Sequence, residues 1–439
     1  MQLTLQAFND GHWQDAFVIT IAAPEAGKHS RVSLQAQTTY AAAYFDETGS
    51  RSFSAMYPVN PMDVYSFNSW PGVFEDIMPM GYARTLWLDM LGLQQQTVAV
   101  QDLTLLQAGT IAPVGNLRLK ESVEMVAGQQ VSALEQMRFE QRQVIERNHD
   151  FLNYARQRGA VSGGATGAGG AAPKLLVRLN SQREVWIDTL QNDNSADAHY
   201  LVKFPRGNTA IDQDILRTEY HYYCELAELG FASMDVAKLQ LQEGSKQPSL
   251  WLPRFDREFN ADAVKRYGVE SVFSLLNKPA GSHLKHEEVL KVLTQVVNSQ
   301  TAAELTAEYL KRDLLNVVFG NSDNHGRNMA VLKQATSVSL APIYDFAPMK
   351  ADPEVVMRTT HWSNTFERGG DIDWLGLCDN LACYGEPELF KTELRQLAAK
   401  LQHLTRRLTE RGVPTSIMQM PVMGFAYLET RLQKWRLLP

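Results

Sequence analysis

The sequence predicts an α+β fold in which a small β-rich N-terminal domain, a second antiparallel sheet and a mostly α-helical C-terminal lobe follow one another. Its 439 residues are too many for one hydrophobic core, which indicates two or three domains. Short β-leaning runs bounded by turn residues recur up to about residue 257. Apolar residues at helical spacing dominate from about residue 285 onward.

The composition narrows the class of function. The chain is 44% hydrophobic and 21% charged, which is typical of a soluble globular protein. A formal net charge of −7 argues against direct DNA binding, because nucleic-acid-binding faces are usually basic. The three cysteines indicate a reducing compartment, and we interpret Cys378 and Cys383 as packing thiols and not as metal ligands. No signal-peptide pattern or membrane-spanning apolar run is visible, so we expect a cytoplasmic protein without membrane contact.

The first 158 residues are expected to form a small domain followed by a connector. Residues 1–120 hold β-leaning runs such as "LTLQAF" and "AFVITIA", and apolar spacing predicts a helix over residues 73–93. The charged, amphipathic stretch at residues 135–159 predicts one helix of several turns. We therefore expect a domain over residues 1–120 and a connecting helix over residues 121–158.

Residues 159–257 predict a second domain built on a sheet. A stretch of Gly, Ala, Ser and Thr at residues 159–172 precedes the strand-like runs "KLLVRL", "EVWIDTL" and "HYLVKFP". A helix ending at Gly230 and two further strand-like runs complete this domain. Residues 258–439 are expected to form the helical lobe, which the polar stretch "GNSDNHGRN" interrupts.

The glycine-rich stretch allows several interpretations. Gly167, Gly169 and Ala172 fit the spacing of a dinucleotide fingerprint, but that motif needs a strand before it and a helix after it. No Gly-Lys-Ser/Thr closes it as a Walker A loop. A kinase-type loop between strands fits better, with Gly167, Gly169 and Gly170 near the phosphates. A plain mobile linker remains the alternative.

Phosphoryl transfer from ATP requires a lysine on the phosphates, often paired with a carboxylate, and the chain offers these in order. Lys203 lies on a strand after the glycine loop, and Glu219 lies in the next helix, where it could reach back to Lys203. Alternatively, Lys203 is an exposed strand residue and Glu219 a first-turn acid favoured by the helix dipole. Arg254, Phe255 and Asp256 lie where a strand end would link two lobes and meet an adenine, or simply end a strand.

The polar stretch adds a catalytic loop to this order. Asp323 and Asn328 are five residues apart, and Asp345 follows at the end of a strand. One carboxylate would orient the attacking hydroxyl and accept its proton, whereas Asn328 and Asp345 would offer oxygen ligands to Mg²⁺. A solvated surface turn is the alternative for residues 321–328.

These residues resemble the HipA-type serine/threonine kinases, the toxins of bacterial toxin–antitoxin modules. "GNSDNHGRNMAVL" is similar to the family's catalytic loop and "LAPIYDF" to its metal-binding segment, and the resemblance spans nearly the whole chain. It implies a kinase-like N-lobe with an antiparallel sheet and a helical C-terminal lobe, related to lipid kinases. It implies ATP and Mg²⁺ as reactants.

The resemblance also assigns roles to residues. Asp323 would be the catalytic base, Asn328 and Asp345 the metal ligands, and Lys203 the phosphate-binding lysine. Lys174 matches a lysine of the family's loop, and His325 lies inside the catalytic motif, where it either contacts the ATP site or packs as a structural residue. The family's autophosphorylated Ser is replaced by Gly here, so Ser162 and Thr166 are the nearby candidates.

The resemblance implies partners as well. Members phosphorylate proteins, in known cases aminoacyl-tRNA synthetases, and are restrained by a helix-turn-helix antitoxin (HipB-like) through which they contact DNA indirectly. Two alternatives remain open. A small-molecule phosphotransferase shares the same catalytic logic, and a non-catalytic subunit of an antitoxin–DNA repressor complex would need none of it.

Overall fold

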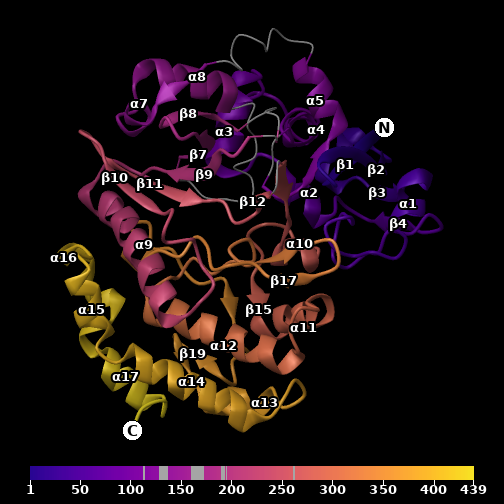
Figure 1. Ribbon diagram of the computed structural model, residues 1–439. Helices are drawn as coiled ribbons and strands as arrows, with labels where there is room; N and C mark the ends of the chain where they lie inside the picture. Colours follow the sequence, from indigo (N-terminus) through magenta and orange to yellow (C-terminus); the bar gives the residue numbers. More distant parts are fainter. Residues whose placement is uncertain (112–113, 128–136, 160–172, 189–192, 194, 261–262) are drawn as a thin grey trace. The chain divides into compact units, whose positions relative to one another are not determined.

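The structure, a computed structural model (Figure 1), describes residues 1–111, 114–127, 137–159, 173–188, 193, 195–260 and 263–439. Contacts within this part of the chain define two compact units. The N-terminal unit comprises Met1–Arg206, Gln242–Ala280 and Ala330–Ala341. The C-terminal unit comprises Gly207–Leu241, Gly281–Met329 and Pro342–Pro439. Helices and antiparallel sheets together confirm the α+β class, whereas the four contiguous domains stay a prediction.

A five-stranded antiparallel sheet opens the N-terminal unit, in the order β4-β3-β2-β1-β5. Its strands are β1 (Gln2–Asn9), β2 (His12–Ile21), β3 (Val32–Ala36), β4 (Val64–Phe67) and β5 (Leu117–Leu119). Asp10 and Gly11 both have positive φ, as a tight Asp-Gly hairpin turn requires, and they join β1 to β2. One face of the sheet packs into a core that includes Leu5, Phe17 and Leu34.

The helix predicted over residues 73–93 is broken, which corrects that prediction. The structure has α2 (Gly72–Ile77) and α3 (Gly81–Met90), with Met78 in an extended conformation before Pro79. Proline lacks the backbone N–H that a helix needs, and it pushes the preceding residue out of the helical region. The other helices of this part are α1 (Thr38–Ala43), α4 (Val98–Ala108), α5 (Lys120–Ala127) and the 3-10 helix η1 (Pro24–His29).

The N-terminal unit also contains a six-stranded sheet, in the order β10-β11-β9-β7-β8-β6. Its strands are β6 (Phe139–Glu140), β7 (Lys174–Leu179), β8 (Glu184–Ile187), β9 (Ala198–Lys203), β10 (Gln240–Glu243) and β11 (Pro248–Pro253). The short helices α7 (Gln141–Ile145) and α8 (His149–Gly159) lie along this sheet (Figure 1) and share one hydrophobic core with it. The sheet therefore has one covered apolar face.

The single helix predicted over residues 135–159 is wrong. Phe139 and Glu140 form β6, which pairs with β8, and α7 and α8 follow as separate helices. The break falls at Arg147, whose φ is +52°, a left-handed conformation that ends a helix. Asn148 then accepts a hydrogen bond from the backbone N–H of Asp150 at 2.8 Å and starts α8. The stretch therefore belongs to the sheet layer.

Small sheets complete the N-terminal unit. A hairpin joins β12 (Arg257–Asn260) to β13 (Ala263–Arg266), and a three-stranded sheet combines β14 (Gly268–Ser271), β16 (Ala330–Lys333) and β17 (Val338–Leu340). The short helix α10 (Val272–Leu275) follows β14. The Lys333 Nζ atom lies 3.3 Å from Glu270, and both side chains are 1% exposed. This ion pair fixes the three-stranded sheet internally.

The C-terminal unit is mainly helical, as predicted. Its helices are α9 (Ala210–Leu229), α11 (His286–Val296), α12 (Ala302–Val318), α13 (Trp374–Asn380), α14 (Pro387–Leu401), α15 (Leu404–Glu410), α16 (Thr415–Met418) and α17 (Leu428–Lys434). Capping boxes begin α9 at Thr209 and α12 at Thr301, and Gly230 ends α9 in the left-handed conformation. Within the described ranges, the helices are too short or too polar to cross a membrane.

Short strands flank this helical core. β15 (Leu284–Lys285) pairs in parallel with β18 (Thr360–His361), and β19 (Glu367–Arg368) forms a hairpin with β20 (Asp371–Ile372). Three 3-10 helices, η3 (Met349–Ala351), η4 (Pro421–Met423) and η5 (Phe425–Tyr427), connect the longer elements of the described chain.

A buried histidine in this unit predicts a pH dependence of stability. His286 is stacked on Trp362, and its Nδ1 lies 2.6 Å from the Tyr309 hydroxyl. Burial lowers the pKa of His286 to about 4. The folded state disfavours protonation of His286. Its contribution to the free energy of unfolding is therefore fully present above the unfolded pKa of about 6.5, and it falls by roughly 1–3 kcal/mol as the pH drops toward 4. Chemical unfolding at pH 7 and pH 5 measures this loss. A His286→Phe variant with the same acid dependence would contradict the assignment.

Candidate active site

The end of α12 sets the start of the candidate catalytic loop. Gly320 has a φ of +67°, and a Cβ built there would lie 2.5 Å from the Met423 Cε atom. Glycine therefore fits both the backbone conformation and the space. The backbone N–H of Asn321 donates to the Asn316 carbonyl at 2.9 Å, and the Asn321 side chain donates to Asn316 Oδ1 at the same distance. These contacts turn the chain out of the helix into residues 321–329.

The loop is held by its own backbone and by asparagines. The Asn328 side-chain amide donates to the Asp323 carbonyl oxygen at 2.8 Å, and the Asn328 N–H donates to the His325 carbonyl at 2.9 Å. The backbone N–H of Asp323 donates to Asn321 Oδ1 at 3.3 Å. The Asp323 carboxylate, 27% exposed, lies 3.4 Å from His325 Nε2. The backbone of Asp323 thus shapes the loop, while its carboxylate stays accessible.

Asp345 occupies an unusual backbone conformation beside this loop. Its φ is +52°, a left-handed conformation that is uncommon for residues other than glycine, although aspartate adopts it more readily than most. Phe346 is 2% exposed and packs against Phe319 and Tyr222. The hydroxyl of Tyr344 donates to the carbonyl of Arg327 at 2.5 Å. The structure therefore ties the Asp345 segment directly to the loop that carries Asp323 and Asn328.

Glu219 lies in the third turn of α9, so its alternative interpretation as a first-turn acid is wrong. It is 3% exposed, and its carboxylate accepts a hydrogen bond from the Tyr223 hydroxyl at 3.0 Å. That hydroxyl also accepts the Phe346 N–H at 3.3 Å. Burial and the charges of Glu219 and Asp345 raise the pKa of Tyr223 well above its ordinary value, which keeps the hydroxyl a donor. The predicted pairing of Glu219 with Lys203 stays a prediction.

Asn328 and Asp345 have the chemistry that Mg²⁺ prefers. The Oδ1 atom of Asn328 is buried and has no hydrogen-bond partner among the described residues. A buried acceptor without a donor is costly, and a cation would satisfy it. Mg²⁺ commonly uses one or two protein carboxylates together with phosphate oxygens and water. Within the described ranges, no cluster of three or more His, Cys, Asp or Glu could hold a metal by itself.

The two candidate phosphate-binding lysines lie opposite each other on the six-stranded sheet. Lys174 begins β7 and Lys203 ends β9, and the two are direct cross-strand partners. They are 9% and 5% exposed. Directly opposite residues share a face of an antiparallel sheet, and like charges placed so repel each other. Both lysines have further contacts within the protein, so their binding of phosphate stays a prediction.

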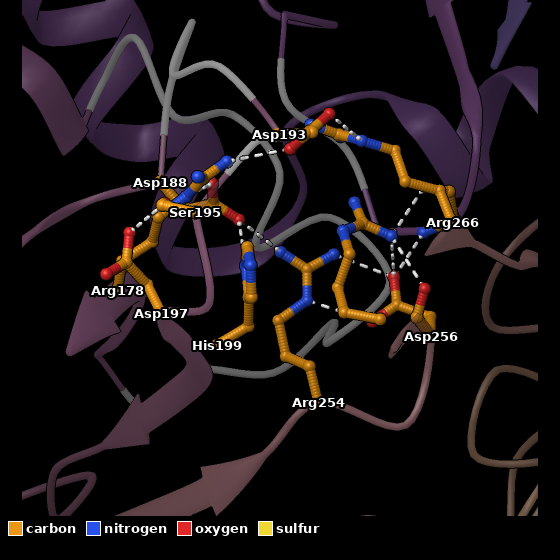
Figure 2. Close-up of polar contacts among 11 residues, drawn as sticks. Arg178, Asp188, Asp193, Ser195, Asp197, His199, Arg254, Asp256 and Arg266 are labelled. Carbon is orange, nitrogen blue, oxygen red and sulfur yellow. Dashed lines mark hydrogen bonds and ion pairs between the residues drawn. The ribbon is translucent and has the colours of Figure 1, made fainter. Parts of the chain in front are cut away.

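Arg254 and Asp256 enter a buried ion-pair network of the N-terminal unit (Figure 2). The Arg254 guanidinium donates two hydrogen bonds to Asp256, at 2.9 and 2.7 Å, and one to Asp188 at 3.0 Å. Arg178 donates to Asp188 at 2.8 Å and to Asp193 at 2.9 Å. The side chains of Arg254 and Asp256 therefore have protein partners, and Phe255 is partly exposed in the turn between them.

The same network extends to further residues. His199 Nδ1 lies 3.2 Å from Asp188, Arg266 pairs with Asp193, and Arg257 pairs with Asp256. Burial by itself would raise the pKa of Asp188, but the charges of Arg178, His199 and Arg254 outweigh it and hold that pKa well below its ordinary value. The carboxylate of Asp188 is therefore ionised at neutral pH.

Some predicted residues lie outside the described ones, and some contacting residues were not predicted. Gly167, Gly169, Gly170, Ser162 and Thr166 fall in residues 160–172, which lie outside the described ranges. Among the unpredicted residues are the tyrosines and network members Tyr223, Tyr344, Arg178, Asp188 and His199. The available signals were weak. Tyr223 follows Glu219 by one helical turn, and Tyr344 immediately precedes Asp345.

Comparisons with known proteins identify the family and the fold of the chain. Residues 166–407, more than half of the chain, match the family described as "HipA-like C-terminal domain". The chain is 28% identical over 129 residues to "Putative kinase Y4mE" of Sinorhizobium fredii, and this match covers 28% of the chain and 30% of that relative. A chain from the solved Shewanella oneidensis MR-1 complex of HipA, HipB and operator DNA has a TM-score of 0.60 at 13% identity. That likeness covers 99% of this chain and 96% of the other, and it shows a shared fold.

Proposed function

This chain belongs to the family of proteins with a HipA-like C-terminal domain, and we propose that it is a toxin kinase. In this proposal it transfers the terminal phosphoryl group of ATP to a serine or threonine hydroxyl of another protein. The observation that carries the proposal is the set of bonds that holds Asp323, Asn328 and the Asp345 segment together. Phosphoryl transfer needs positioned carboxylates and cations more than covalent chemistry by the protein.

Asp323 would act on the acceptor hydroxyl. Its carboxylate accepts the hydroxyl proton as the oxygen bonds to the terminal phosphorus, while the bond from that phosphorus to the bridging oxygen of ADP breaks. ADP leaves with the electron pair of that bond. The hydrogen bonds that shape the loop use the backbone of Asp323 and the side chain of Asn328, so the Asp323 carboxylate oxygens take no part in them and are left for the acceptor hydroxyl.

Asn328 Oδ1 and the Asp345 carboxylate would hold Mg²⁺, which when bound neutralises charge on the phosphates. The left-handed backbone of Asp345 and the buried contacts of Phe346 fix the backbone position from which that carboxylate extends. Lys174 and Lys203, cross-strand partners in the six-stranded sheet, are the phosphate-binding lysines of this proposal. These features support ATP with Mg²⁺ as the reactant.

We further propose a helix-turn-helix antitoxin as partner, with DNA contacted only through it. Support comes from the shared fold with a chain of the Shewanella oneidensis complex, which contains HipB and operator DNA. The net charge of −7 also disfavours direct DNA binding by this chain. The phosphorylated protein in this proposal is a component of translation, such as an aminoacyl-tRNA synthetase, by resemblance to the family.

A lysate phosphorylation assay tests the proposed function. The full-length protein is incubated with radiolabelled ATP and a bacterial lysate, and labelled proteins are separated by electrophoresis. We expect label on at least one protein, loss of that label when EDTA is added, and its return with excess Mg²⁺. Absence of transfer to the protein itself, to lysate proteins and to small acceptors would overturn the proposal. Label on a metabolite in preference to protein would favour a small-molecule phosphotransferase.

A further inference from the structure

A pocket of about 760 Å³ opens in the C-terminal unit beside the candidate catalytic loop. Asn321 and Ser322 of the loop form part of its lining, and residues 355–358 form another part. The Ser322 hydroxyl donates to the carbonyl oxygen of Val356 at 2.5 Å. The pocket wall and the loop therefore share a hydrogen bond one residue before Asp323.

A second residue binds the wall to the loop. The side chain of Asn324 donates to the Thr360 carbonyl at 2.9 Å and accepts the Thr359 N–H at 3.2 Å. Asp323 thus lies between two residues, Ser322 and Asn324, whose side chains anchor the loop to the segment 356–360. An occupant of the pocket would lie next to the residue that receives the acceptor hydroxyl.

The charge of the pocket is mainly positive. Lys285, Lys350 and Arg358 line it, whereas Glu367, the one acid among its described lining residues, already pairs with His361 at 2.9 Å. The Arg358 side chain is 10% exposed, and its Nη2 atom donates to Asp313 at 3.0 Å while its Nε atom lies 3.6 Å from Glu367. Its Nη1 atom has no hydrogen-bond partner within the described ranges and is the part of the guanidinium left for a ligand. Burial and the charges of Arg431 and Arg358 lower the pKa of Lys350, so cations surround this lysine. An anion is the complementary ligand.

The rim of the pocket is apolar and strained. Val355 and Met357 are 72% and 74% exposed. Val355 also has a φ of +57°, which is a genuine outlier for a β-branched residue. Neighbouring exposed apolar side chains and strained backbone are both found frequently at binding sites. A small inorganic anion would leave both side chains in water.

We propose that this pocket binds a segment of the acceptor protein in which an acidic side chain is followed by an apolar one. The acid would meet Lys350 and Arg358, and the apolar side chain would cover Val355 and Met357. The inference rests on the proposed function for its occupant, because it names the protein that Asp323 acts upon. It adds a determinant of specificity outside the catalytic loop.

Nuclear magnetic resonance of methyl-labelled methionine tests the pocket without ATP. The full-length protein is titrated with a capped peptide of alternating Glu and Leu, and with the same peptide carrying Gln for Glu. A Met357→Leu variant identifies the Met357 methyl signal. We expect that signal to shift with the Glu peptide, at an affinity about tenfold higher than for the Gln peptide, because a charged hydrogen bond is lost.

Variants link the shift to the pocket. Lys350→Gln is expected to weaken the Glu peptide about tenfold, whereas the exposed control Lys238→Gln should bind as wild type. No shift, equal shifts with both peptides, or a response to inorganic phosphate but not to the Glu peptide would overturn the inference. Because binding is measured without nucleotide, its failure is distinct from the failure of the lysate assay. Peptide binding without any phosphate transfer would support the proposed binding site and contradict the proposed kinase activity.

Discussion

Replacing Asp323 by Asn is expected to lower the rate of phosphate transfer by about 10²–10⁴-fold, the range that a general base contributes. The amide has nearly the same shape but cannot accept the proton of the acceptor hydroxyl. The bonds that shape the loop involve the backbone N–H and carbonyl of Asp323, so the variant should keep the loop. The initial rate of label transfer from radiolabelled ATP measures the effect.

Two controls make this result specific. The thermal unfolding midpoint of Asp323→Asn should match wild type, since the replaced carboxylate is 27% exposed. Asp235→Asn, an equally conservative change at a side chain that is 49% exposed, should keep the full rate. An Asp323→Asn protein with wild-type transfer would rule out the assigned base. If the protein were a non-catalytic repressor subunit, wild type and Asp323→Asn would repress their operon equally.

Replacing Asp188 by Asn is expected to destabilise the protein by about 3–5 kcal/mol at neutral pH. Asp188 is 4% exposed and neutralises Arg178 and Arg254, so its loss leaves two buried guanidinium groups short of a counter-charge. Urea unfolding of both proteins at pH 7 measures the difference. Asp10→Asn, at a side chain that is 61% exposed, is the matched control and should change stability by less than about 0.5 kcal/mol.

The same variant has a predicted pH signature. The pKa values of Asp188 and Asp256 lie below their ordinary range, because buried arginines hold both carboxylates ionised. Their contribution is therefore present above the unfolded pKa of about 3.9 and is lost as the pH falls below it. The gap between wild type and Asp188→Asn should narrow between about pH 5 and pH 2. A gap that stays constant over that range would contradict the role of the charge.

Local patterns predicted much of the fold. The runs that predicted β7, β9 and β11 contain apolar residues, alternating or consecutive, over the length of a strand. Gly230 marks the end of α9. Where prediction failed, one residue overrode the pattern. Pro79 divided a stretch with helical spacing, and Arg147 took a left-handed conformation that no propensity indicates. The strand β6 has two residues and exists only because β8 lies beside it.

The candidate site divides in the same way. Polar residues between buried runs indicate a functional role, and this signal led to the prediction of Asp323, Asn328 and Asp345. Tyr223 and Asp188 could not be predicted, because their partners are distant in sequence and emerge only after folding. Tyr223 meets Phe346 across 123 residues, and Asp188 meets Arg254 across 66. Long-range contacts of this kind carry no local signal in a single sequence.

The path of the chain between the two units has a consequence for how the protein can be divided. The chain passes from one unit to the other at residues 206–207, 241–242, 280–281, 329–330 and 341–342. Neither unit is therefore one continuous stretch of the sequence, so no single cut of the chain separates the two complete units from each other. The last two passages frame the hairpin Ala330–Ala341, which begins two residues after Asn328 and ends four residues before Asp345. A protease nick in that hairpin would sever the covalent link between the two candidate metal ligands while sparing both of them.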